Sequence, residues 1–263
     1  MAGKDDYYNR AKQEGYRSRA AYKLKQLDGE AGLFETGETV VDLGAAPGGW
    51  LQVAAEAVGP GGTVVGVDFQ RIRAFDDHEH VETLKGDMTA DRTKDRLGEL
   101  IGDDGADVVL SDMAPNMTGE YSLDHARSVH LARQAFGVAR EHLAPGGDFV
   151  VKVFQGPDLE ALKDDLDEAF QYVRTMSPDA SRDSSSEVYL VGKGRLTAPV
   201  SVGETHDLEI VDVGSEGDGI ARIEGFTVFV PGEVGETVSA RIADVKPRFA
   251  FAERVAESAD DSQ

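Results

Sequence analysis

The feature that most constrains this chain is a short segment in which a predicted buried strand runs into a glycine-rich turn and then into a predicted helix. Residues 40–50 read V-V-D-L-G-A-A-P-G-G-W. The small residues of the turn leave the backbone free to approach a ligand closely and to adopt positive φ angles. Such a turn, between a strand and a helix, predicts an open α/β sheet that binds a nucleotide-like cofactor.

Two cofactor classes fit such a turn, and the spacing of its residues favours one of them. The dinucleotide fingerprint requires G-x-G-x-x-G, whereas this turn reads G-A-A-P-G-G, with Ala46 in place of the second glycine. Pro47 also removes one backbone N–H donor. Asp42 before the turn and Asp68 at the end of the next predicted strand suit S-adenosylmethionine, which has an amino-acid end and a ribose. An acid at the position of Asp68 serves both cofactor classes, so it does not separate them.

Composition narrows the class of protein. The chain has 263 residues and is 40% hydrophobic, which is enough for one large domain and a small one. It has neither an apolar run near the roughly 20 residues that span a bilayer nor a signal-peptide pattern, so we expect a cytoplasmic enzyme with no membrane partner. There is no cysteine, and the six histidines are scattered. His125 and His130 are poorly spaced to share a metal, so we expect surface histidines and no metal.

Charge is distributed unevenly along the chain. The net charge of −22 by itself argues against a nucleic-acid partner. Residues 1–27 nevertheless carry seven basic side chains against three acidic ones, which gives this stretch a charge of +4 and the remainder −26. The basic stretch is consistent with RNA binding, and the acidic remainder with a halophilic source. An ordinary acidic protein whose N-terminal stretch is a solvated helix face is the alternative.

Predicted strands alternate with predicted helices through most of the chain, which is typical of a parallel sheet covered on both faces. The expected strands are 39–43, 63–67, 81–85, 106–111 and 148–154. The expected helices are 49–58, 92–101, 122–143 and 158–170. Two further strands, 171–177 and 187–192, are expected to form a hairpin, which would make one of them antiparallel to the rest.

From about residue 198 the pattern changes to short alternating strands separated by glycine-rich turns. The expected strands are 208–213, 219–223, 227–230 and 237–245, which suit a small, closed OB-like barrel. We therefore expect an α/β domain over 1–197, an all-β barrel over 198–256 and an acidic, disordered tail over 257–263.

The ends of the predicted strands carry the chemically informative side chains, because ligands in open α/β sheets bind beyond the carboxyl ends of the strands. Asp68 is placed to accept hydrogen bonds from ribose hydroxyls. Asp87 is placed to accept one from an adenine amino group, although a simple turn aspartate explains it equally well. Asp112 follows the strand 106–111, where a methyl donor would meet its acceptor. Lys152 interrupts the apolar run F-V-V-K-V-F, and a lysine held out of bulk water near a carboxylate is a candidate proton acceptor.

These segments together resemble the FtsJ-type family of ribosomal RNA ribose 2′-O-methyltransferases, over residues 7–193. The matching segments are Y-R-S-R-A-A-Y-K-L (16–24), D-L-G-A-A-P-G-G-W (42–50), D-M-A-P-N (112–116), V-K-V-F (151–154), Ser181-Arg182 and E-V-Y (187–189). The resemblance implies a Rossmann-like sheet that binds S-adenosylmethionine, and a Lys-Asp-Lys-Glu tetrad formed by Lys23, Asp112, Lys152 and Glu187. It also implies cofactor contacts from Gly48, Trp50, Asp68, Asp87 and Asp112.

The chemistry of ribose methylation agrees with this tetrad. A 2′-hydroxyl is a poor nucleophile, whereas the sulfonium methyl is already activated, so the enzyme must align the two groups and remove a proton. We expect Lys152 to accept the proton, Asp112 to orient its amino group, and Lys23 with Glu187 to place the ribose. Neighbouring charges of both signs act on Lys152, so a true base and an electrostatic guide both stay open.

Residues 198–256 resemble the TRAM domain, a small RNA-binding barrel that is found fused to RNA-modifying enzymes. The matching segments are G-D-G-I-A (217–221), V-F-V-P-G (228–232), G-E-T-V (235–238) and I-A-D-V-K (242–246). This stretch holds 11 acids against 5 bases, but most bases lie late in it, near Phe249 and Phe251, at Arg241, Lys246, Arg248 and Arg254. They predict a local phosphate-binding and stacking face; a barrel that only supports the catalytic domain is the alternative.

The expected function is S-adenosylmethionine-dependent 2′-O-methylation of a uridine ribose in large-subunit (23S) ribosomal RNA. The expected partner is this RNA, either free or within the large ribosomal subunit. Transfer RNA is the alternative substrate, and a non-catalytic RNA-binding assembly factor is the alternative from another class. Ala46 and the lack of an evident hydride-transfer residue argue against a nicotinamide-dependent oxidoreductase.

Overall fold

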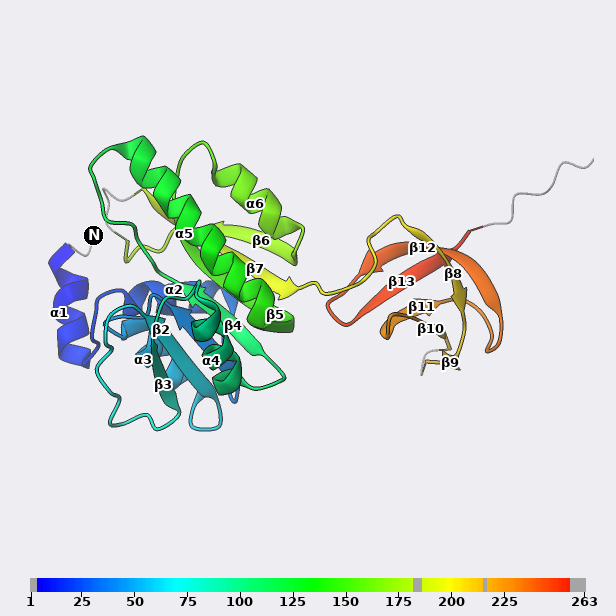
Figure 1. Cartoon of the computed structure of the whole chain (residues 1–263), viewed down its shortest axis with the longest axis horizontal. Coiled ribbons are helices and arrows are strands. Elements are labelled where there is room, and N and C mark those ends of the chain that lie inside the picture. The colour runs from blue at the N-terminus through cyan, green and yellow to red at the C-terminus, as the bar shows by residue number, and fades with distance from the viewer. Residues whose placement is uncertain (1–3, 182–185, 215–216, 256–263) are drawn as a thin grey trace, which may run out of the picture. The chain divides into compact units, whose positions relative to one another are not determined.

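The computed structural model describes residues 4–181, 186–214 and 217–255, and it divides the chain into two compact units, Met1–Arg195 and Leu196–Gln263 (Figure 1). The domain boundary expected from the sequence, between 197 and 198, lies two residues beyond this division. The expected acidic tail and Arg182 lie outside the described residues. None of the described helices is long and apolar enough to cross a membrane.

A seven-stranded sheet forms the centre of the first unit, in the order β3-β2-β1-β4-β5-β7-β6. Its strands are β1 (Thr39–Leu43), β2 (Thr63–Asp68), β3 (Val81–Lys85), β4 (Ala106–Ser111), β5 (Leu143–Phe154), β6 (Phe170–Met176) and β7 (Glu187–Arg195). The strands from β3 to β5 pair in parallel, and β7 runs antiparallel to both of its neighbours. The expected hairpin with one reversed strand is therefore confirmed, and the reversed strand is β7.

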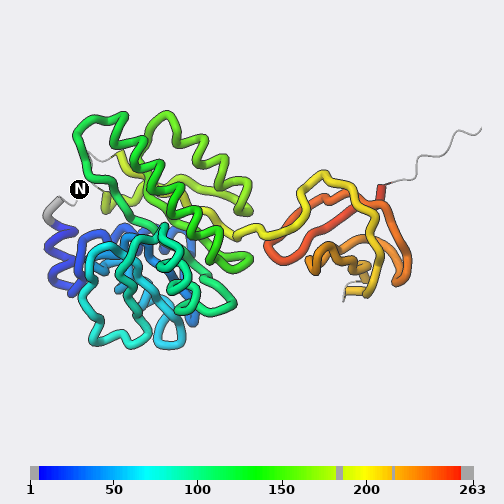
Figure 2. The backbone as a smooth tube through the Cα atoms, in the orientation of Figure 1, coloured from blue at the N-terminus to red at the C-terminus, as the bar shows by residue number. Residues whose placement is uncertain are grey.

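Helices lie on both sides of this sheet (Figure 2). They are α1 (Lys4–Glu14), α2 (Ala21–Ala31), α3 (Gly49–Val58), α4 (Asp91–Ile101), α5 (Tyr121–His142) and α6 (Leu159–Asp167). Apolar residues of α4, α5 and α6 share one buried cluster with the sheet, and those of α2 and α3 share a second. Because both faces are covered, β1 and β2 are almost continuous apolar runs.

The strands and helices expected in this unit are confirmed to within a few residues, except at the N-terminus and before β5. The basic N-terminal stretch forms α1 and α2, which its charge alone did not predict. Ala20 precedes α2 without a side-chain cap, so the sequence carries no capping signal there. β5 begins at Leu143, five residues before the expected start at 148, and therefore includes the P-G-G segment at 145–147.

The glycine-rich turn connects β1 to α3 as expected. Gly44 and Gly48 lie in the left-handed region, at φ 78° and 107°. A Cβ atom at Gly44 would lie 2.2 Å from Cγ of Met113, so glycine is needed here for space as well as conformation. β1 lies between β2 and β4, and the turn therefore lies beside the ends of both strands.

The second unit is a six-stranded all-β sheet in the order β8-β12-β13-β11-β10-β9. Its strands are β8 (Thr205–Glu209), β9 (Asp212–Val213), β10 (Gly219–Ile223), β11 (Phe226–Val230), β12 (Thr237–Val245) and β13 (Phe249–Arg254). The edge strands β8 and β9 are consecutive in the chain, so the sheet curls around a core that includes Val228, Ile242 and Ala250. The all-β unit is confirmed, but as a curled half-barrel with two edge strands in place of the closed barrel expected. The single strand expected over 208–213 is divided between β8 and β9, and β13 was not expected.

Candidate active site

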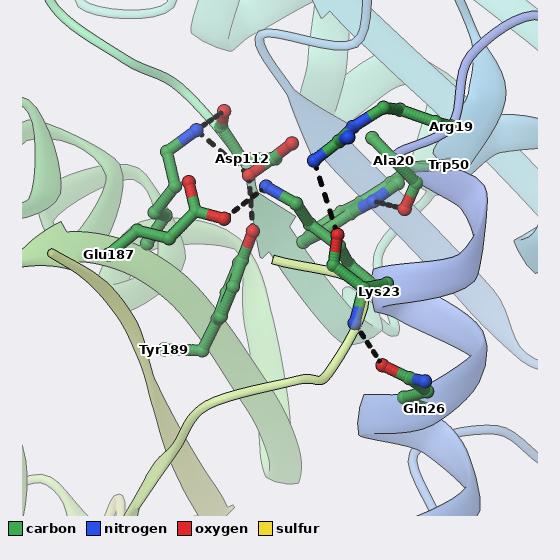
Figure 3. Close-up of polar contacts among 10 residues, drawn as sticks. Arg19, Ala20, Lys23, Gln26, Trp50, Asp112, Glu187 and Tyr189 are labelled. Carbon is green, nitrogen blue, oxygen red and sulfur yellow. Dashed lines mark hydrogen bonds and ion pairs between the residues drawn. The ribbon is translucent and has the colours of Figure 1, made fainter. Parts of the chain in front are cut away.

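Four elements bring the expected tetrad together beside the end of β4 (Figure 3). The Nζ atom of Lys152, in β5, donates to Oδ1 of Asp112 at 2.9 Å and to the backbone oxygen of the same residue at 2.5 Å. Nζ of Lys23, in α2, lies 2.5 Å from Oε1 of Glu187, the first residue of β7. The lysines are only 7% and 8% exposed, so each side-chain nitrogen lies largely out of water beside a carboxylate.

The carboxyl group of Glu187 is ionised within this cluster. Burial by itself would raise its pKa, but the charge and hydrogen bond of Lys23, the nearby hydroxyl of Ser181 and the charge of Lys152 together lower the pKa below the usual range. Earlier in the chain, Ala180 is joined to α2 and the residues before it: its amide donates to Oε1 of Gln26 at 2.9 Å, and its backbone oxygen accepts from Arg19 at 3.3 Å. Glu187 is therefore a fixed negative charge that faces both lysines.

Tyr189 connects the two ion pairs, and the sequence analysis gave it no role. Its hydroxyl donates to Oδ1 of Asp112 at 2.6 Å, and Nζ of Lys23 lies 5.8 Å from the centre of its ring. The side chain is fully buried; its burial and then the charges of Asp112 and Glu187 raise its pKa well above the usual range. The phenol thus stays protonated and acts as a donor. The available signal was strand alternation, which places residue 189 on the same face of β7 as Glu187.

A cleft of about 770 Å³ lies at the carboxyl ends of β1, β2 and β4, within the usual range for small-molecule sites. Asp68, Asp87 and Asp112, all expected at a cofactor site, line it together with Gly44 and Ala46 of the turn. It reaches the tetrad through Asp112. The same carboxylate therefore borders both the cleft and the proton-transfer group.

Backbone contacts hold two of these acids in place. Oδ2 of Asp68 accepts from the amide of Ala46 at 2.9 Å, and Oδ1 accepts from Gln70 at 2.7 Å. Asp87 accepts hydrogen bonds from the amide and from the hydroxyl of Thr89. Both bonds lower the pKa of Asp87, and the bond from the amide has the larger effect. A carboxylate offers about four acceptor positions, so each group can still accept from a ligand.

Comparison with known families decides which kind of enzyme this site belongs to. Residues 16–195 match the FtsJ-like methyltransferase family, and residues 199–255 match the TRAM domain. The chain belongs to the FtsJ-like methyltransferase family. All four tetrad residues and all five expected cofactor contacts lie within the matched residues.

Whole-length relatives of this FtsJ-like methyltransferase are found in archaea. It is 66% identical over 263 residues to the ribosomal RNA large subunit methyltransferase E of Halorubrum lacusprofundi, covering 100% of this chain and 97% of the relative. The protein of the same name in Methanococcoides burtonii is 51% identical over 251 residues, covering 95% and 92%. A crystal structure assigned as a ribosomal RNA methyltransferase from Plasmodium falciparum has a TM-score of 0.61 at 29% identity, and the match covers 68% of this chain and 98% of that one.

Gly48 and Trp50, the other two expected cofactor contacts, lie outside the lining of the cleft in this FtsJ-like methyltransferase. Trp50 is buried; its Nε1 donates to the backbone oxygen of Ala20 at 2.8 Å, and its ring lies 5.9 Å from that of Tyr189. Its indole therefore connects α3 to the start of α2, the helix that carries Lys23. The side chain of Trp50 therefore has a structural contact here, and its contact with a cofactor stays a prediction.

Arg17 holds one wall of the cleft and was not singled out from the sequence. Its guanidinium donates to the backbone oxygens of Arg73 and Ala74, each at 2.6 Å, and lies 3.6 Å from the centre of the Phe75 ring. This segment follows β2, and its first residues, including Gln70, line the cleft. A Cβ atom at Gly48 would lie 3.0 Å from Nη1 of Arg17, so the arginine also closes over the glycine turn.

The expectation that the histidines lie on the surface is wrong for His125. Its Nε2 accepts from the amide of Asp158 at 3.1 Å, which leaves the proton on Nδ1 to be donated to the backbone oxygen of Phe154 at 2.9 Å. The ring is buried between α5 and the segment after β5 because it satisfies that backbone. His130 is exposed and lines the cleft.

Proposed function

We propose that this methyltransferase transfers a methyl group from S-adenosylmethionine to the 2′-hydroxyl of a uridine ribose in large-subunit ribosomal RNA. The observation that carries the proposal is the buried amino group of Lys152, hydrogen-bonded to Asp112 at the border of the cleft. A proton acceptor beside a methyl-donor cleft suits an acceptor group that must lose a proton. The names of the relatives support ribosomal RNA as the molecule that carries this ribose.

The residues of the cleft fit S-adenosylmethionine. Gly44 and Ala46 line the cleft with little or no side chain, so a ligand can approach their backbone, and Asp68 offers carboxylate oxygens to ribose hydroxyls. Asp87 offers an acceptor to the adenine amino group. Among the described residues, Oδ2 of the buried Asp42, two residues before Gly44, has no hydrogen-bond partner; it is a buried polar atom beside the turn that a polar ligand group would satisfy. When bound, this cofactor supplies a methyl group that its positive sulfur makes open to attack.

The tetrad positions and deprotonates the 2′-hydroxyl that accepts the methyl group. Lys152 accepts the proton of the 2′-hydroxyl at Nζ, and Asp112 holds that nitrogen in place and stabilises the ammonium ion that forms. The ion pair of Lys23 and Glu187 positions the ribose beside it. Tyr189 donates to Asp112 and thereby keeps the carboxylate oriented toward Lys152.

The second unit supports an RNA substrate. The rings of Phe229, Phe249 and Phe251 contact one another, with centres 5.4 to 5.7 Å apart, and Phe251 is 42% exposed. Lys246 and Arg248 lie in and beside the turn that leads to β13. Aromatic rings next to basic groups bind single-stranded RNA by stacking and charge.

Mapping ribose methylation in total RNA, with and without this protein, tests the proposal. Loss of one 2′-O-methyl group from large-subunit ribosomal RNA is expected; loss from transfer RNA, or no loss from any RNA, would contradict it. Lys152→Ala should abolish methyl transfer while S-adenosylmethionine still binds. Lys163→Ala, which removes a lysine that pairs with Asp167 on the same helix, α6, is the matched control. Substantial turnover by Lys152→Ala would remove the proposed role of this lysine.

A further inference from the structure

An exposed aromatic ring lies next to the strand that carries the proton acceptor. Tyr121, the first residue of α5, is 58% exposed. Its hydroxyl donates to the backbone oxygen of Gln155 at 2.6 Å, and Gln155 directly follows β5. Gln155 lies three residues after Lys152, a separation of about 10 Å along an extended chain. The ring is therefore anchored at its polar end while its faces stay open to solvent.

The segment that presents this ring is well ordered. Asp124, which is buried in the first turn of α5, accepts from the amide and the hydroxyl of Thr118, both at 2.8 Å. Its second oxygen accepts from the amide of Gly119 at 3.0 Å. An exposed ring that is already fixed loses little conformational entropy when it binds a planar partner.

Gln155, which accepts the hydrogen bond from Tyr121, lies close to the tetrad along the sheet. The amide of Gln155 donates to the backbone oxygen of Ser186 at 2.8 Å, and Phe154 pairs with Glu187 in the ladder between β5 and β7. The hydroxyl of Tyr121 thus contacts the first residue beyond the β5–β7 ladder at its tetrad end. An RNA strand whose ribose reaches Lys152 would pass its neighbouring nucleotides over this position.

We propose that Tyr121 is a stacking platform for an unpaired base of the RNA strand that flanks the methylated ribose. This inference rests on the proposed function, because it needs an RNA acceptor. Base stacking on an aromatic side chain is tolerant of sequence and is the usual means of holding splayed nucleotides. Tyr121 would fix the register of the strand so that a single ribose lies at Lys152.

The charge of the chain gives stacking particular value here. With a net charge of −22, the protein gains little from general attraction to phosphate. At the molar salt that its haloarchaeal relatives indicate, the Debye length is about 3 Å, so that attraction weakens further. Stacking releases no counterions, and its contribution should persist as salt rises.

The test compares three variants by steady-state methylation of an unmodified large-subunit ribosomal RNA transcript. Tyr121→Leu removes the ring and should raise the KM for RNA about 5- to 100-fold, with kcat and the KM for S-adenosylmethionine unchanged. Tyr121→Phe keeps the ring and loses only the anchor, so its KM for RNA should stay within about 3-fold of the parent. Tyr172→Leu, which removes a tyrosine 46% exposed on the edge strand β6, is the matched control.

The order of the two Tyr121 variants separates stacking from a structural role. If the ring only braced the segment after β5, loss of the hydroxyl would matter as much as loss of the ring, and Tyr121→Phe would equal Tyr121→Leu. That result, or equal KM in the parent and Tyr121→Leu, would overturn the inference. Failure of the proposed function would look different, because the parent chain would then methylate no ribose in this RNA. The effect of Tyr121→Leu should also persist from low to high KCl.

Discussion

Replacing the buried Asp42 by asparagine should change how the stability of the protein depends on pH. Asp42 lies in β1 and is 2% exposed; burial, and then the charges of Asp112 and Asp68, raise its pKa well above the ordinary value of 3.8. At pH values between the unfolded and folded pKa, the folded chain therefore holds a proton that the unfolded chain has lost. The contribution of Asp42 to the free energy of unfolding then falls as pH rises through this interval, and asparagine, which does not titrate, removes this loss.

The size of the effect follows from linkage. One proton bound only by the folded state corresponds to about 1.4 kcal/mol per pH unit. From about pH 5 upward, the free energy of unfolding of Asp42→Asn minus that of the parent should increase at this rate. The increase should stop at the pH where Asp42 ionises in the folded parent. The buried amide of the variant can cost roughly 1 to 3 kcal/mol, but this cost does not vary with pH. The slope is therefore diagnostic, and the absolute difference is not.

Trp50 makes the measurement specific to the catalytic unit, because it is the single tryptophan of the chain and lies in α3, which follows β1 directly after the glycine turn. Urea unfolding followed by its fluorescence, at constant KCl and a series of pH values, gives the two stability curves. Asp42→Ala, which also cannot titrate, should show the same slope with a different offset. Parallel curves for the parent and both variants would refute the argument that Asp42 is protonated in the folded protein.

Three further predictions concern the reaction and its substrates. Tyr189→Phe removes a hydrogen bond to the carboxylate of Asp112, worth about 1.5 to 3 kcal/mol. The kcat should therefore fall roughly 10- to 100-fold while the KM for S-adenosylmethionine stays constant. An unchanged kcat would exclude the positioning role. Arg17→Lys loses the paired donors that hold the segment after β2, so the KM for S-adenosylmethionine should rise about 10-fold with little change in kcat, as steady-state kinetics would show. Deletion of residues 198–263 should weaken RNA binding at least about 10-fold, in a filter-binding assay, and leave cofactor binding intact; equal RNA affinity would favour a purely supporting second unit.

Local patterns account for most of the elements that the sequence predicted. The turn of residues 44–48 needs glycine for its own φ angles and close contacts, and the strand before it, β1, is buried on both faces. Information of this kind lies within a few residues of the chain. The first two helices and β13 went unpredicted because both helices are rich in charged residues, α2 has no side-chain cap at its start, and β13 follows β12 after only three residues.

The four tetrad residues were expected from resemblance, and no local physical rule would have selected them as a group. The contacting residues lie far apart in the sequence. Lys152 lies 40 residues from Asp112, and Tyr189, which is not a tetrad member but also contacts Asp112, lies 77 residues from it. The reversed strand β7 places Tyr189 opposite Lys152, and strand alternation puts Glu187 on the same face. A pattern along the chain contains no information about such a register until the sheet order is known.

The sequence alone was sufficient for the alternating α/β order, the glycine turn, the acids at the strand ends and the change to an all-β unit, since each depends on neighbouring residues. The tertiary structure decided what those residues contact. In it, the indole of Trp50 donates to Ala20, and His125 is buried against the segment after β5. Arg17, Tyr121 and Tyr189 each contact elements that are distant in the sequence. The direction of a side chain is set by the packing of several elements at once, and a single stretch of sequence does not contain it.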